Sequence, residues 1–372
     1  MVAVDLLPRE RFGLGLSGDV LEIGPGTTPF PTAPGAVVRF ADRPMPGGRD
    51  ANFPELIGEP HGPDADYELD LDVDGLTGIE DRSVDAVVLS HVIEHVANPI
   101  HALEECLRVL RPAGRLVLIV PLRHATFDAL RPGTSLAHLL AEDRAGVTEV
   151  DVDHIREFCH SVYHHTPSEP SETLEWHNPD RLDDELVALH RRRSIHVHCW
   201  DAEEMASALV GLTAVERFGF RLVDLFFDDD PGAAEIEFGL VVEPAPPGLE
   251  TATAFIDAWV GAVLGDETRD PARIATLTAA LARDLSAVLG FDEAAGALVG
   301  RPAERAALLL RDAQAEGHAL TAAKAAAEAR AVETAAQLAG RDRELDDVLQ
   351  SRTHRAGQAV TAPVRLLRRI TR

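Results

Sequence analysis

The stretch DVLEIGPGTTPF, Asp19–Phe30, decides the fold prediction. Its first part, Asp19–Ile23, is a short run rich in Val, Leu and Ile, which is typical of a strand buried in a parallel sheet. A Gly-Pro-Gly turn follows at Gly24–Gly26. Because glycine has no Cβ, the backbone can turn sharply there and a ligand can lie against it. Thr27 and Thr28 come next and are residues that cap helices, so the stretch predicts a strand, a ligand-binding turn and then a helix.

Apolar runs of the same kind recur over the first two thirds of the chain. Val37–Ala41, Val84–Leu89 and Arg115–Val120 are three of them, with patterns typical of helices or turns in between. This alternation predicts an α/β fold with a doubly wound, Rossmann-like sheet. Phe220–Phe227 and Glu235–Val242 are two later runs joined by a short turn, which suits an antiparallel pair at the sheet edge.

Composition divides the chain into successive segments. The prolines of EPAPPG, Glu243–Gly248, predict a linker that ends the sheet domain. Beyond it, apolar residues recur at helical spacing, and an arginine-rich tail closes the chain. The predicted segments are a domain at 1–248 with a substrate-side insertion at 122–200, a helical subdomain at 249–312, an alanine-rich helix or weak coiled coil at 313–350, and a basic tail at 351–372.

The overall charge excludes one class of partner. The 372 residues include 62 acidic and 35 basic side chains, for a formal net charge of −27, which argues against a nucleic-acid-binding protein. Three widely spaced cysteines suit a reducing compartment rather than a disulfide framework. No apolar run reaches the roughly 18 residues of a membrane span. We therefore expect a cytoplasmic protein. Peripheral contact of the basic tail with the inner membrane face is a hypothesis, with a disordered basic tail as its alternative. Homo-oligomer formation through the C-terminal helices is a further hypothesis.

Two carboxylates flank the glycine turn. Glu22 stands just before it, and Asp42 follows the second strand, where an acid can accept hydrogen bonds from a ribose diol. A dinucleotide site would have a third glycine where this chain has Pro29. A carboxylate at Glu22 suits a cation better than a pyrophosphate, so the pattern predicts S-adenosylmethionine rather than NAD. A turn that binds no ligand is the alternative.

These motifs, with the segment from ELDLDVDG to LRPAGRLVLIVP, resemble class I S-adenosylmethionine-dependent methyltransferases over about residues 18–122. The resemblance implies that Asp42 holds the ribose hydroxyls and that Asp72, or its neighbour Asp70, faces the adenine. One departure is Ala113, where the family usually has a glycine. The cofactor-binding residues that the resemblance implies are Glu22, Gly24, Gly26, Asp42, Asp72 and Ser90.

His91 and His95 belong to an H-x-x-E-H sequence that is also the motif of an inverted zinc-peptidase helix. Here the motif directly follows a buried strand, and Asn98-Pro99 begins a new helix, so a zinc helix is not expected. The position at the carboxyl end of a strand favours a ligand-binding loop instead. His95 or His91 is therefore the predicted general base for a substrate hydroxyl; the alternative is that His95 only packs the loop.

The polar segment after the fifth strand is the predicted substrate-side insertion. With SIHVHCWD, Ser194–Asp201, it resembles methyltransferases associated with bacterial surface-polysaccharide assembly, which implies O-methylation of a saccharide or glycolipid-type acceptor. A solvated surface segment and a non-catalytic scaffold that keeps the cofactor fold are the alternatives. The predicted substrate-binding residues are His124, Asp128, Arg131, His138 and His154. No metal is predicted, because none of the 16 histidines forms a local pair matched by a second pair at a recognised spacing.

Overall fold

The computed structural model describes residues 6–48, 57–58, 61–165, 175–289 and 293–315. The basic tail at 351–372 and the alanine-rich segment beyond residue 315 lie outside the described residues. Among the described helices, none is both long and apolar enough to cross a bilayer.

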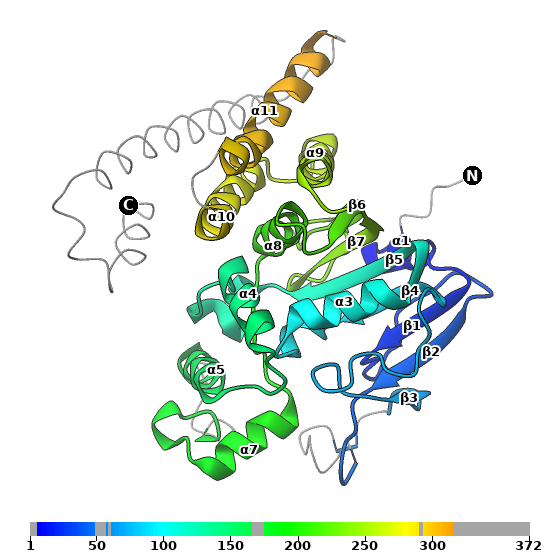
Figure 1. The fold of residues 1–372 in the computed structure, drawn as a ribbon, viewed down its shortest axis with the longest axis vertical. Coiled ribbons are helices and arrows are strands. Elements are labelled where there is room, and N and C mark those ends of the chain that lie inside the picture. Colours follow the sequence, from blue (N-terminus) through cyan, green and yellow to red (C-terminus); the bar gives the residue numbers. More distant parts are fainter. Residues whose placement is uncertain (1–5, 49–56, 59–60, 166–174, 290–292, 316–372) are drawn as a thin grey trace, which may run out of the picture.

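A seven-stranded mixed sheet forms the centre of the molecule (Figure 1). Its strands are β1 (Asp19–Ile23), β2 (Val37–Asp42), β3 (Tyr67–Glu68), β4 (Val84–Ser90), β5 (Leu110–Pro121), β6 (Gly219–Phe226) and β7 (Glu237–Ala245). The spatial order is β3-β2-β1-β4-β5-β7-β6, and β7 runs in the direction opposite to the other six strands. The predicted α/β fold with an antiparallel pair at one edge is confirmed.

Both faces of the sheet are buried, which explains the continuous apolar runs of its strands. Val20, Val88 and Val117 point to one face, where Phe12 of α1 (Pro8–Gly13) packs on them. Leu21 and its equivalents in β4 and β5 point to the other face, against α3 (Pro99–Val109) and α8 (Ala202–Ala214). As predicted, Asn98 caps α3 by accepting a hydrogen bond from the amide of His101.

Two local predictions are wrong. No helix follows the glycine turn: residues 24–36 form turns and extended chain, because Pro29, Pro31 and Pro34 prevent a continuous helix. The linker is also shorter than predicted, since β7 continues to Ala245 beside β6. Pro244 fits in that strand because β7 pairs with β5 only as far as Val242, so its second edge is free there.

The chain between β5 and α8 forms short turns and three helices on one side of the sheet (Figure 1). These are η3 (Arg123–Ala125), η4 (Phe127–Leu130), α4 (Leu136–Ala145), α5 (Val152–His165), η5 (Pro179–Arg181) and α7 (Asp184–Arg193). A small separate core holds α5 against the chain at Ile195 and Val197. The insertion ends where it began, because Leu122 and Trp200 form a β-bridge.

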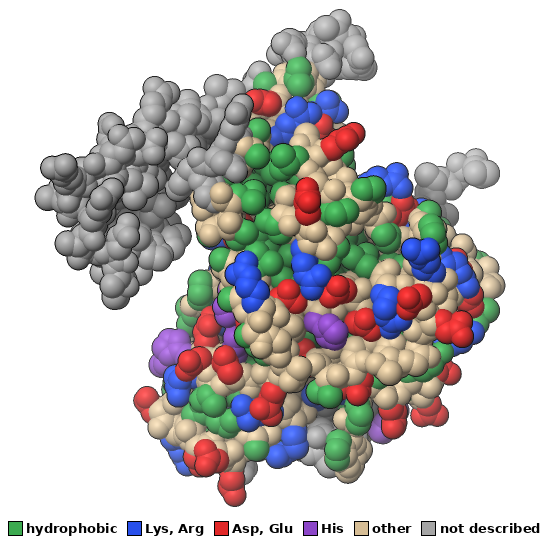
Figure 2. Space-filling view, viewed as in Figure 1, with side chains coloured by type: hydrophobic (Ala, Val, Ile, Leu, Met, Phe, Trp, Pro, Cys, Tyr) green, Lys and Arg blue, Asp and Glu red, His purple; other side chains and the backbone are tan. Residues whose placement is uncertain are grey.

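Three C-terminal helices pack beside α8, as Figure 1 shows. They are α9 (Leu249–Gly265), α10 (Arg273–Val288) and α11 (Glu293–Ala315). Phe255 and Trp259 of α9 belong to the same buried cluster as Leu118 of β5, so one apolar core runs across the predicted boundary at residue 248. On the visible face of these helices, hydrophobic side chains show between scattered charged ones of both signs (Figure 2).

Candidate active site at the carboxyl ends of β1, β2 and β4

The glycine turn after β1 has the backbone conformation that its sequence predicts. Gly24 (φ +63°) and Gly26 (φ +56°) both lie in the left-handed region. A Cβ at Gly24 would come within 2.8 Å of the Val92 side chain, which follows β4. A Cβ at Gly62 would overlap the carbonyl oxygen of Gly26, so the backbone at Gly62 crosses directly over the turn.

Glu22 is a buried carboxylate two residues before this turn. Only 2% of the residue is exposed, and Oε1 accepts a hydrogen bond of 2.9 Å from the amide of Phe30. Its Oε2 has no hydrogen-bond partner among the described residues. Burial raises the pKa of Glu22 to about 7, although the Phe30 amide and the charge of Arg9 oppose the shift. A buried oxygen without a partner is costly, and an ammonium group at the turn would supply one.

The other acids are arranged around the same sheet edge. Asp42 ends β2, where Oδ1 accepts the amide of Arg43 and burial raises its pKa. Both oxygens of Asp72 accept backbone amides, those of Ala97 and Asn98, each at 3.0 Å. Asp72 thus holds the loop before α3. The carboxylate of Asp70 instead accepts the amide of Asp72. The adenine-binding role predicted for Asp72, with Asp70 as its alternative, stays a prediction.

The loop after β4 carries the two candidate bases. Ser90 is the half-buried last residue of β4, and His91 follows in the left-handed region (φ +56°). Ile93–His95 is a short 3-10 turn, η2, rather than the regular helix that a zinc-peptidase motif requires. Because β1 and β4 are parallel neighbours with Ile23 beside Leu89, this loop lies at the same sheet edge as the glycine turn.

His91 is held by a charged network. Its Nε2 lies 2.8 Å from Oε2 of Glu237, which also receives two hydrogen bonds from Arg9. Burial disfavours the charged form of Glu237, but the hydrogen bonds from His91 and Arg9 outweigh it and hold its pKa well below the usual range. An ionised Glu237 accepts the Nε2 proton of His91, so this network orients the ring.

One ring nitrogen of His95 makes no hydrogen bond among the described residues, although this Nε2 lies 3.6 Å from Oε1 of Glu94. Nδ1 of His95 lies 2.9 Å from the carbonyl oxygen of Ile195, which can only accept, so Nδ1 carries the proton and Nε2 has the lone pair. Burial lowers the pKa of His95, which keeps the ring neutral near pH 7. Glu94 beside it is fully buried with no hydrogen bond to either oxygen, and burial raises its pKa. The imidazole is neutral and partly exposed, so Nε2 can accept a hydrogen bond from a hydroxyl, but the same burial makes it a weak base.

Two of the predicted substrate residues form a buried pair inside the insertion. Asp128 and Arg131 are 1% and 4% exposed, and Nη1 of Arg131 donates to Oδ1 of Asp128 at 2.7 Å. Arg131 also donates to the carbonyl oxygens of His196 and Val197, and Nδ1 of His196 lies 2.6 Å from Asp128. These contacts account for both side chains without a ligand, so their predicted substrate role remains a prediction.

The other three predicted substrate residues are separated. His124 lies at the surface, with Nδ1 2.7 Å from Asp201 at the start of α8. His138 of α4 and His154 of α5 instead face each other, with 3.0 Å between their Nε2 atoms.

A cavity of about 800 Å³ lies beside α7, lined by Trp176, Arg181 and Leu189 among others, and none of the predicted site residues line it.

Comparison with known proteins relates one segment of this sheet to a protein family. Residues 62–118 match the sequence model for a methyltransferase domain. The part of the chain described here has that domain's mixed α/β sheet, with the glycine turn and the acids at one edge. The chain therefore contains a segment similar to a methyltransferase domain, and that segment lies within a Rossmann-like α/β sheet. The buried Oε2 of Glu22 beside the glycine turn fits S-adenosylmethionine, whose methionine part carries an ammonium group.

Further similarities to the methyltransferase domain are short or distant. A 43-residue stretch is 51% identical to an uncharacterised 37.1 kDa protein in transposon TN4556 of Streptomyces fradiae, and it covers 12% of each chain. A solved structure from Rhodobacter sphaeroides, described as a putative Zn-dependent alcohol dehydrogenase, is 15% identical, with a TM-score of 0.35 over 62% of this chain and 85% of that one. A putative S-adenosylmethionine-dependent methyltransferase from Listeria monocytogenes is 14% identical, with a TM-score of 0.32 over 63% and 95%.

Several residues of the methyltransferase domain's site were not predicted from the sequence. Glu237 joins His91 across 146 positions, and Glu94 lies between the two candidate bases. Glu142 and His198 join His138 and His154. Only the spacing of His138 and Glu142, four residues apart on one helix face, could have signalled a shared site.

Proposed function

We propose that the protein transfers a methyl group from S-adenosylmethionine to a hydroxyl oxygen of a saccharide or glycolipid-type acceptor. The observation that supports cofactor binding most directly is the buried carboxylate of Glu22, which stands two residues before the glycine turn and whose Oε2 has no hydrogen-bond partner in the described structure. His95, on the neighbouring strand end, supports transfer to a hydroxyl. The acceptor class rests on the resemblance of the polar insertion to polysaccharide-associated methyltransferases.

In this proposal the chain's own residues hold the cofactor, orient the acceptor hydroxyl and remove its proton. Glu22 and the turn at Gly24–Gly26 hold the methionine part, and Asp42 holds the ribose hydroxyls. When bound, the cofactor supplies a methyl carbon activated by its sulfonium. Nε2 of His95 takes the hydroxyl proton of the acceptor, which adds roughly a hundredfold or more to the rate. Placing the acceptor oxygen in line with the methyl carbon supplies the larger part of the rate enhancement.

Calorimetry with S-adenosylmethionine tests the cofactor site on the full chain. We expect the wild type to bind and Asp42→Ala to lose at least tenfold in affinity, because the ribose loses its acceptor. Asp153→Ala is the matched control, since Asp153 is an exposed acid on α5 whose partner is Arg156. A wild type that does not bind the cofactor, or an Asp42→Ala variant that binds as tightly, contradicts the proposed site.

Transfer of the labelled methyl group to saccharide fractions of a cell extract tests the reaction. Loss of transfer in His95→Ala, with unchanged cofactor binding, supports His95 as the base. If His95→Ala and His91→Ala both keep near-normal turnover, neither histidine is the base. Cofactor binding by the wild type with no transfer to any acceptor favours the second candidate function, a scaffold that keeps the cofactor fold.

A further inference from the structure

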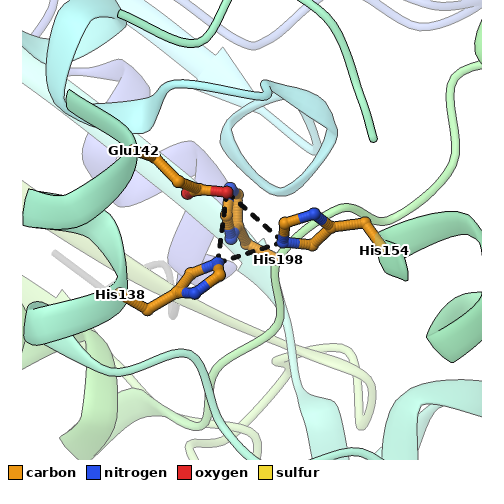
Figure 3. Close-up of side chains that lie close together, drawn as sticks. All are labelled: His138, Glu142, His154 and His198. Atoms are coloured by element: carbon orange, nitrogen blue, oxygen red, sulfur yellow. Dashed lines mark hydrogen bonds and ion pairs between the residues drawn. The ribbon is translucent and has the colours of Figure 1, made fainter. Parts of the chain in front are cut away.

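Four side chains of the insertion converge on one point beside the sheet. His138 and Glu142 lie one turn apart on α4, His154 lies at the start of α5, and His198 lies in the chain that leads back to β-bridge residue Trp200. One ligand atom from each residue, a ring nitrogen or a carboxylate oxygen, lies within 4.8 Å of the ligand atoms of the other three. Figure 3 shows the four side chains pointing toward a common centre from three separate segments.

Four of the distances between these atoms are close to those between the ligands of a tetrahedral metal ion. With metal–nitrogen distances of about 2.0–2.1 Å, tetrahedral ligands lie about 3.3 Å apart. Nε2 of His138 lies 3.0 Å from Nε2 of His154 and 3.2 Å from Oε1 of Glu142. Nε2 of His154 lies 3.4 Å from the same oxygen, and Nε2 of His198 lies 3.4 Å from the other carboxylate oxygen.

His198 is the member of this group whose buried ring nitrogens have no hydrogen-bond partner among the described residues. The residue is fully buried. Oε2 of Glu142, which faces it, is also buried without a hydrogen bond. A neutral imidazole with an unused lone pair is what a metal ion requires.

The surroundings of His154 favour coordination through Nε2. Its Nδ1 lies 3.0 Å from Oδ1 of Asp151, which fixes the proton on Nδ1 and leaves the lone pair of Nε2 pointing at the centre. A carboxylate behind a coordinating histidine is the usual outer support of a metal ligand. The side chain of His138 is 43% exposed, so an ion can reach the group from solvent.

We propose that His138, Glu142, His154 and His198 bind one divalent transition-metal ion, with zinc preferred. Three imidazoles and one carboxylate suit zinc, whereas magnesium and calcium take oxygen ligands. With four protein ligands the site is closed, so the ion has a structural role. This assigns His138 and His154 to the metal instead of the acceptor.

The ion would hold the insertion against the active-site loop. The backbone amides of Val197 and His198 both donate to the carbonyl oxygen of Glu94, at 2.7 and 3.0 Å. Nδ1 of His95 also donates to the carbonyl oxygen of Ile195 in the same segment. Fixing His198 therefore fixes the backbone that positions His95.

Zinc binding to the untagged full chain tests this proposal. After dialysis against a chelator, the wild type is titrated with Zn²⁺ in competition with a coloured chelator. We expect about one ion per chain and an affinity at least about a hundredfold lower in His138→Ala and His154→Ala, because each loses a ligand. Asp151→Asn should lose about 10–100-fold. His160→Ala, an exposed histidine on the same helix as His154, is the matched control and should bind like the wild type.

A second measurement needs no variant and covers the case in which a variant fails to fold. Because the ion binds the folded state, Zn²⁺ should raise the melting temperature of the chelator-treated wild type, and Mg²⁺ should not. The proposal is overturned if the wild type binds zinc no more tightly than His138→Ala, or if Zn²⁺ leaves its melting temperature unchanged. Neither measurement involves methyl transfer, so this proposal and the proposed function fail independently.

Discussion

At the scale of single residues, Glu22 links the sequence motif to a measurable pH dependence. Its carboxylate has a pKa raised to about 7 by burial, so near neutral pH it is only partly ionised in the free protein. A cationic ligand prefers the ionised form. Because the ionised fraction rises from about a tenth at pH 6 to about nine tenths at pH 8, affinity should rise with pH.

We therefore predict that the affinity for S-adenosylmethionine increases about tenfold between pH 6 and pH 8, and that Glu22→Gln removes most of this increase. Calorimetric titrations at several pH values measure it. The control is Asp153→Ala, which should keep the wild-type pH profile. Equal slopes in the wild type and Glu22→Gln would show that Glu22 does not face the bound cation.

Ala113 has a strained backbone conformation that a single substitution can test. It occupies the left-handed region (φ +64°) in an exposed turn at the start of β5, where the resembled family usually has glycine. We predict that Ala113→Gly stabilises the protein by about 0.5–1 kcal/mol, because glycine adopts this conformation without strain. Urea unfolding measures the change. Gly114→Ala should have the opposite sign, since its Cβ would lie 2.9 Å from the carbonyl oxygen of Arg111; a destabilised Ala113→Gly would contradict the strain.

At the scale of elements, the insertion depends on a buried ion pair. Arg131 and Asp128 are three residues apart and almost fully buried, whereas Arg156 and Asp153, with the same spacing, are exposed. We predict that Arg131→Met costs about 3–5 kcal/mol of unfolding free energy, because the buried Asp128 loses its arginine and keeps only His196 as a partner. Arg156→Met should cost less than about 1 kcal/mol. Denaturant unfolding of both variants compares them; similar small losses would mean that the buried pair does not anchor the insertion.

The elements also show which parts of the fold can be predicted from sequence. Asp19–Ile23 and Val84–Leu89 were predicted nearly residue for residue, because strands buried on both faces carry continuous apolar runs. The two-residue strand β3 offers no such run. The predicted helix after Gly26 failed because capping threonines cannot outweigh the prolines that follow.

The candidate site was predictable only where its residues are close in sequence. Glu22, Gly24 and Gly26 lie in one motif, and Asp42 ends the next strand. By contrast, His198 meets Glu142 across 56 positions, and His91 meets Glu237 across 146. Such contacts depend on how the insertion folds back on the sheet, and no local periodicity records that.

At the scale of the whole molecule, the C-terminal helices share the core of the methyltransferase domain. Trp259 of α9 is fully buried and packs against Phe227, with ring centroids 5.1 Å apart. We predict a single cooperative unfolding transition by calorimetry, in which Trp259→Ala costs about 3–5 kcal/mol. A chain ending at residue 248 should be poorly folded, because the faces of α8 and β6 that α9 covers would be exposed. Two separate transitions, or a well-folded shortened chain, would show that the helices form an independent unit.

The bridge between Leu122 and Trp200 has a consequence for how such an enzyme can diversify. The amide of Arg123 donates to the carbonyl oxygen of Trp200 at 2.9 Å, so the stretch between them leaves and rejoins the sheet at one place. The number of residues in this stretch can therefore change without moving either of its ends on the sheet. An exchanged stretch must, however, keep the backbone contacts that Ile195, Val197 and His198 make to His95 and Glu94, because these contacts hold the loop after β4.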